Sequence, residues 1–217
     1  MKEETYFYCV LRPVIFFMGF FLFIGGIYMK KNDKTLFLVQ KAMLLALAIV
    51  FMLVIRFPLL PAAKFLEYDM GDIPLVIATL LFGAPTGVLM LGLEALVQSL
   101  TVSAASSWEG FVMHFCAGTL FLVTVSLISK IGKKNGKEKL FLCIGLVVGT
   151  LISTAVMIPL NLIFTPMYLG VEVDAVKQLM LPAIIPFNLL KGAINTIVAI
   201  ATYLPLKKIL KKTHMAE

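Results

Sequence analysis

Long apolar runs separated by short polar segments dominate this 217-residue chain. About 20 consecutive apolar residues are needed to cross the hydrocarbon core of a bilayer, and most of the runs approach or reach that length. The composition agrees, since 60% of the residues are hydrophobic and 14% are charged, whereas a soluble domain has about 45–50% and about 25%. The chain is therefore predicted to be an all-α integral membrane protein with helices over residues 8–29, 36–55, 72–82, 87–102, 110–129, 140–160 and 183–204.

Lysine-rich segments alternate with the other connections between these runs. Because cytoplasmic loops of membrane proteins are enriched in Lys and Arg, residues 30–41, 130–139 and 205–217 are predicted to lie inside. The loops 56–72, 101–109 and 162–182 then fall outside, and the C-terminus is cytoplasmic. The net charge of +7 follows from this pattern, so it does not indicate a nucleic-acid partner.

This topology divides the chain into two parts. Residues 1–35 carry an extra N-terminal apolar segment, which we expect to form a transmembrane helix, and residues 36–212 form a domain of six transmembrane helices. The segment 72–82 is short for a full crossing.

Lys191 is the most informative single residue. It shares a helix face with Asn188, three positions earlier, and lies roughly 12 Å inside the last apolar run at about 1.5 Å per residue. An ammonium near the bilayer centre costs about 2.5–3.5 kcal/mol on insertion scales, which marks such residues as candidate functional sites. We expect a bound ligand to meet this charge.

Further polar and aromatic residues near the predicted outer helix ends complete a candidate substrate-binding set, namely Asn161, His114, Tyr68, Trp108 and Glu94. Amides and ammonium groups offer several donors and acceptors, and with apolar neighbours they suit a small molecule that has a flat apolar part and several hydroxyls or carbonyls.

Each of these residues also has a structural interpretation. Asn161 and Asn195 could form helix–helix hydrogen bonds, and Glu94 could form an ion pair, face a cavity or contact a partner. Trp108 suits an interfacial anchor, and a lone His such as His114 is often a packing group.

Enzymatic chemistry is not indicated. The Lys-rich segment 132–137 lacks the glycine spacing and the hydroxyl of a P-loop, and neither a metal-ligand cluster nor a Ser/His/Asp arrangement is found in the sequence. The three cysteines lie in apolar runs and are interpreted as packing residues. No catalytic cofactor or metal is expected.

Five motifs together resemble one known family, the substrate-binding S components of energy-coupling factor (ECF) vitamin transporters, especially the riboflavin-specific members. The motifs are AxxxA at residues 42–46, FLEYDMGDIP at 65–74, FGAP at 82–85 with HFxAGT at 114–119, and IPFNLLKG at 185–192. The resemblance extends from about residue 39 to 208.

The resemblance implies a six-helix S component that binds riboflavin from outside with high affinity. Ala42 and Ala46 would pack on a membrane T component that is driven by two ATPase subunits, and the loop 56–72 would cap the site. Asn188, Lys191 and Asn161 would bind the vitamin. His114 and Glu94 differ from the residues common in riboflavin-specific members, so pantothenate or a pyridoxine-like compound is an alternative ligand, and a stand-alone secondary transporter is an alternative function.

Overall fold

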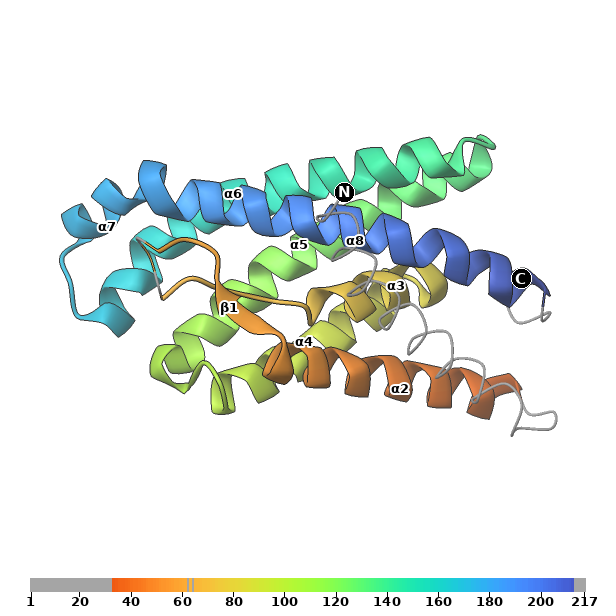
Figure 1. The fold of residues 1–217 in the computed structure, drawn as a ribbon, viewed down its shortest axis with the longest axis horizontal. Helices are drawn as coiled ribbons and strands as arrows, with labels where there is room; N and C mark the ends of the chain where they lie inside the picture. The colour runs from red at the N-terminus through yellow and green to blue at the C-terminus, as the bar shows by residue number, and fades with distance from the viewer. Residues whose placement is uncertain (1–32, 62, 64, 213–217) are drawn as a thin grey trace, which may run out of the picture.

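The structure is a computed structural model that describes residues 33–61, 63 and 65–212. The predicted N-terminal transmembrane helix lies outside the described residues. The described part is mostly helical, and its elements follow in the order α2 (Asp33–Val54), β1 (Arg56–Pro58), β2 (Glu67–Asp69), α3 (Asp72–Phe82), α4 (Ala84–Leu100), the 3-10 turn η1 (Ala104–Ser106), α5 (Ser107–Lys134), α6 (Glu138–Leu169), α7 (Val173–Leu179), the π-helical turn η2 (Met180–Ile184) and α8 (Ile185–Lys212) (Figure 1).

Four helical segments of the described residues are long and apolar enough to cross a membrane. They are Phe37–Val54, Ala104–Lys134, Glu138–Leu169 and the continuous stretch Val173–Lys208. The helices α3 and α4 are shorter, with 11 and 17 residues. At about 1.5 Å per residue, α3 extends only about 16 Å, roughly half of a bilayer core of about 30 Å.

The predictions for the loops 56–72 and 162–182 are wrong in part. Residues 56–69 contain an antiparallel two-stranded ribbon, β1–β2, in which Phe57 lies opposite Tyr68. The helix α6 continues through Pro159 and Pro166 to Leu169, because neighbouring helices and side chains in a membrane bundle compensate for the backbone bonds that proline removes. The connection after α6 is consequently short, and the rest of the predicted loop 162–182 contains the short helix α7.

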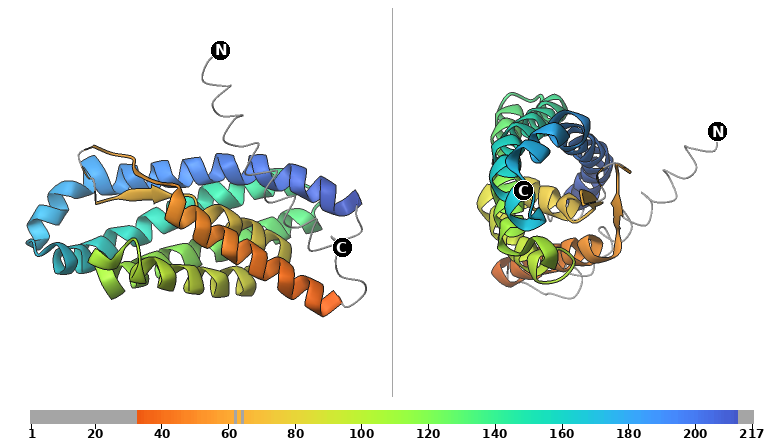
Figure 2. Two further views of the ribbon diagram at one scale, coloured as in Figure 1. Left: turned by 60° about the horizontal axis from the view of Figure 1, so that its bottom comes forward. Right: turned by 90° about the vertical axis from the view of Figure 1, so that its left-hand side faces the viewer.

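The Lys-rich segments of the described chain lie at one end of the bundle. Figure 1 places the start of α2, the turn between α5 and α6, and the end of α8 together at the right, while η1 and α7 lie at the left. The left view of Figure 2 shows the same separation from another direction. The predicted alternation of Lys-rich and other connections is therefore present in the fold.

The helix α3 lies in the centre of the bundle. Its residues Ile73, Leu75, Val76, Ile77 and Ala78 are at most 1% exposed, as expected for a helix that is hydrophobic on all sides. The ribbon β1–β2 leads directly into α3. The polar side chains at this junction, Asp69 and Asp72, therefore lie in the interior of the bundle.

Candidate functional site

Lys191 meets two carboxylates inside the bundle. Its Nζ lies 3.1 Å from Oδ2 of Asp72 at the start of α3 and 3.3 Å from Oδ2 of Asp69 in β2. The side chain of Asp69 is 3% exposed and that of Lys191 is 17% exposed. The protein itself therefore supplies two counter-charges to this ammonium, and the expected contact between Lys191 and a bound ligand stays a prediction.

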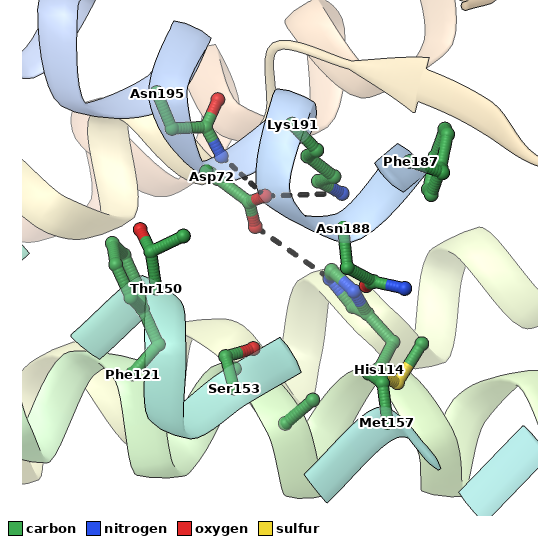
Figure 3. Close-up of a pocket in the computed structure, with 13 residues that line it drawn as sticks. Asp72, His114, Phe121, Thr150, Ser153, Met157, Phe187, Asn188, Lys191 and Asn195 are labelled. Atoms are coloured by element: carbon green, nitrogen blue, oxygen red, sulfur yellow. Dashed lines mark hydrogen bonds and ion pairs between the residues drawn. The ribbon is translucent and has the colours of Figure 1, made fainter. Parts of the chain in front are cut away.

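Asp72 is the centre of a wider polar network (Figure 3). Its Oδ2 also accepts a hydrogen bond from Nδ2 of Asn195 at 3.0 Å, and its Oδ1 lies 3.9 Å from Nε2 of His114. Oδ1 of Asn195 accepts a hydrogen bond of 3.0 Å from the Tyr68 hydroxyl. Burial raises the pKa of Tyr68, so this phenol remains a donor at neutral pH. The predicted inter-helix bonding role of Asn195 is confirmed by its bond to α3.

Glu94 pairs with His114. The carboxylate, on α4, is fully buried, and its Oε2 lies 3.2 Å from Nε2 of His114 on α5. Among the described residues its Oε1 has no hydrogen-bond partner. Gly71 allows the chain before α3 to approach this carboxylate, because a Cβ at that position would lie 2.8 Å from Oε1. Of the roles considered for Glu94, the ion pair fits this geometry.

Two adjoining cavities flank Lys191. The first, here called the bundle chamber, has a volume of about 100 Å³, and its lining includes Asp72, Thr150, Ser153, Asn188 and Asn195 (Figure 3). The second, here called the hairpin chamber, has a volume of about 140 Å³ and is lined in part by Arg56, Glu67, Asp69, Ser103 and Tyr168. Four side chains line both chambers and separate them, namely His114, Met157, Phe187 and Lys191.

The structure brings together some of the predicted binding residues and not others. Asn188, Lys191 and His114 line the chambers, while Glu94 and Tyr68 stand behind them and bond to the residues there. Asn161 is fully buried and bonds only within α6 among the described residues, donating to the Met157 carbonyl at 2.8 Å and accepting from Thr165.

Trp108 lies apart from the chambers. It is 53% exposed and meets Phe164 edge-on, with 5.6 Å between ring centroids. This placement suits the interfacial anchor considered for it.

Sequence reasoning missed Asp69, Asp72 and Arg56. All three belong to the segment 56–72, which is predicted to be an external loop and was given no binding residue besides Tyr68. A signal was available, because an intramembrane lysine usually pairs with another ionisable group, and this segment holds three carboxylates, Glu67, Asp69 and Asp72. Thr150 and Ser153 on α6 also line the bundle chamber. No comparable feature of the sequence predicts their position there.

Comparison with known proteins gives consistent matches. Residues 36–203 match the family model described as the substrate-specific component of ECF transporters. The chain is 30% identical to the riboflavin transporter FmnP of Bacillus subtilis (82% of this chain, 96% of the relative). It is 32% identical to the riboflavin transporters RibU of Staphylococcus aureus (85% and 95%) and Streptococcus thermophilus (74% and 78%).

A solved structure supports the same relationship. The S component of a bacterial ECF transporter superposes with a TM-score of 0.69 at 31% sequence identity, and the match covers 82% of this chain and 99% of that one.

Proposed function

The chain belongs to the substrate-specific components of ECF transporters, and we propose that the vitamin it captures is riboflavin. It is a membrane transport subunit and not an enzyme. In this proposal the protein binds riboflavin from outside the cell and delivers it inward when docked on a T component driven by two ATPases. It is a multi-pass cell membrane protein, and the grouping of its Lys-rich ends supports a cytoplasmic C-terminus.

One observation carries the proposal at the level of the site: Lys191 lines both chambers and stands one turn from Asn188. Lys has three donors, so the ammonium can bond both carboxylates and still donate to a ligand. Nδ2 of Asn188 donates to the Ile184 carbonyl at 2.8 Å, which leaves its Oδ1 to accept from a ligand. Riboflavin offers carbonyls to the first group and N–H or hydroxyl donors to the second.

Arg56 adds a hydrogen-bond donor in the wall of the hairpin chamber. Its Nε pairs with Glu67 and its Nη2 donates to Ser103 at 3.0 Å, but its buried Nη1 has no partner among the described residues. Because Arg56 lines the hairpin chamber, we assign this group to a carbonyl or hydroxyl of the ligand.

The size of the chambers predicts a rearrangement on binding. Each is smaller than the roughly 300–1,000 Å³ of typical ligand pockets, so riboflavin has to occupy both, and the side chains between them must move. Met157 and Phe187 are suited to this, since Met adapts its shape easily and neither carries a charge.

A pyridoxine-like ring is the second candidate, because the hairpin chamber of about 140 Å³ suits a small single ring better than a tricyclic one. The two candidates are distinguished by titration of the detergent-purified protein. Riboflavin binding quenches or shifts the flavin fluorescence, and co-purified flavin absorbs visible light. Submicromolar riboflavin affinity that excess pyridoxine does not reduce supports the proposal, whereas competition by pyridoxine at equal concentration contradicts it.

We propose that six helices, α2 to α6 and α8, form the membrane bundle. An extra N-terminal transmembrane helix within residues 1–35 would precede them. In this arrangement α3 begins inside the membrane, which agrees with its length of 11 residues and with the burial of Ile73 to Leu80. The six-helix domain then corresponds to residues 36–212.

An exposed stripe on α2 supports docking on the T component. Residues four apart on this helix, Leu38, Ala42, Ala46, Val50 and Val54, are all exposed. Small residues at this spacing allow a second helix to approach closely in a membrane. We propose that Ala42 and Ala46 form the centre of the contact, with the larger residues on either side of it.

A further inference from the structure

A third cavity lies at the Lys-rich end of the bundle, away from both chambers. It has a volume of about 140 Å³ and lies between the end of α3 and the last turns of α5. Its lining residues are Thr79, Leu80, Leu81, Gly83, Ser126, Ser129, Lys130 and Lys133. We call it the lysine cavity. At about 30 Å³ per water in the liquid, it has room for roughly four water-sized groups, which is close to the size of a phosphate.

The interior of this cavity holds a hydroxyl without a partner. Ser129 is 4% exposed, and among the described residues its Oγ has no hydrogen bond. Buried hydroxyls are nearly always satisfied by protein, water or ligand. Ser126, one turn earlier on α5, is 3% exposed and lines the same cavity. The interior is thus polar and can donate to an anionic oxygen.

Two ammonium groups stand at the opening. Nζ of Lys133 lies 3.4 Å from the Leu80 carbonyl near the end of α3, and this long contact is its one hydrogen bond to the described residues. Lys130 lines the cavity one turn earlier. The nearby carboxylate of Glu138 pairs with Lys207, and no carboxylate is among the residues that line the cavity. The cavity is therefore suited to an anion.

From these contacts we propose that the lysine cavity binds the phosphate of an anionic phospholipid. Basic pockets between transmembrane helices on the cytoplasmic side are known sites for such headgroups. The same helix offers a surface for the acyl chains, since Leu127 and Ile131 on α5 are 56% and 51% exposed and flank Lys130. A free phosphate has the same chemistry at the headgroup but makes no use of these apolar residues.

The experiment is native mass spectrometry of the full-length, detergent-purified protein titrated with phosphatidylglycerol or phosphatidylcholine. We expect tighter binding of phosphatidylglycerol. Replacement of both lysines (Lys130→Gln with Lys133→Gln) should weaken it about 25-fold, at about fivefold per lysine. The matched control, Lys134→Gln with Lys139→Gln, removes the same charge from the same end of the bundle and should weaken it less than about threefold.

A second variant tests the interior of the cavity. Ser129→Ala should weaken phosphatidylglycerol binding without lowering thermal stability, because it removes a hydroxyl that bonds to none of the described residues. The proposal is overturned if the control pair weakens binding as much as the cavity pair, if Ser129→Ala leaves binding unchanged, or if phosphatidylcholine binds equally well. Binding of inorganic phosphate without binding of phosphatidylglycerol would overturn the lipid assignment. Riboflavin binding should be unaffected by these variants, so the test is independent of the proposed function.

Discussion

Replacement of Lys191 by methionine separates its structural role from its role toward the ligand. The substitution keeps an unbranched side chain that is only one atom shorter, and it removes the charge that Asp69 and Asp72 share at 3.3 and 3.1 Å. Loss of one partner of a buried ion pair typically costs about 3–5 kcal/mol, because the remaining charge is left uncompensated. At about 2–4 °C per kcal/mol for a chain of this size, the Tm of Lys191→Met should fall by about 6–20 °C.

The same variant should bind riboflavin more weakly. A hydrogen bond to a charged group contributes about 1.5–3 kcal/mol, which corresponds to roughly 10- to 150-fold in Kd. Thermal unfolding and flavin fluorescence titration, both in detergent, measure the two effects on one sample. Lys177→Met is the matched control, since Lys177 pairs with Asp174 on the surface, and it should change neither Tm nor affinity.

A double variant decides between the two roles. Asp69→Asn removes the more deeply buried of the two carboxylates, so adding it to Lys191→Met should recover about 1–3 kcal/mol of stability. The riboflavin affinity should stay low, because the missing donor is not replaced. If the double variant regains wild-type affinity, Lys191 acts only by holding the bundle together, and the proposed contact with the vitamin is refuted.

Three further predictions rest on individual contacts. Tyr68→Phe should destabilise the protein by about 1–3 kcal/mol, measured by thermal unfolding, because it leaves Oδ1 of Asn195 without its donor. Gly192→Ala should cost about 1–3 kcal/mol by overpacking, since its Cβ would clash with Cγ2 of Thr150, and adding Thr150→Ala should recover part of that loss in the same assay. Ala46→Leu should leave riboflavin binding by the isolated subunit unchanged and reduce uptake by vesicles that contain the T component and both ATPases; normal uptake would exclude this face as the docking surface.

The longer helices could be predicted because their hydrophobic runs are long and continuous. The ribbon β1–β2 could not, since its strands have three residues each and are stabilised by pairing across an intervening loop that no local pattern encodes. The length of α6 was underestimated for a related reason. Proline predicts a helix end in water, but Pro159 and Pro166 lie within a helix that neighbouring helices support.

Of the candidate site, the residues on α8 could be predicted from the sequence, whereas the carboxylates that meet Lys191 could not. Lys191 and Asn188 are conspicuous because they interrupt an apolar run, and both line the chambers. Asp69 and Asp72 are not conspicuous, since they belong to a polar segment with Pro, Gly and other acidic residues, a composition typical of solvated loops. Their burial is a consequence of the ribbon, which directs the start of α3 into the bundle.

The balance of charge around the chambers restricts the class of ligand further. Arg56 is paired with Glu67, which leaves the three carboxylates Asp69, Asp72 and Glu94 facing Lys191 and His114. A carboxylate-bearing vitamin such as pantothenate would add another negative charge to a buried cluster that already has an excess of them, and like charges in such a site repel strongly. A neutral ligand rich in hydroxyl and N–H donors has the opposite effect, because each donor can satisfy a carboxylate oxygen. Riboflavin and a pyridoxine-like compound both meet this condition, so a competition experiment should show pantothenate to be the weakest of the three.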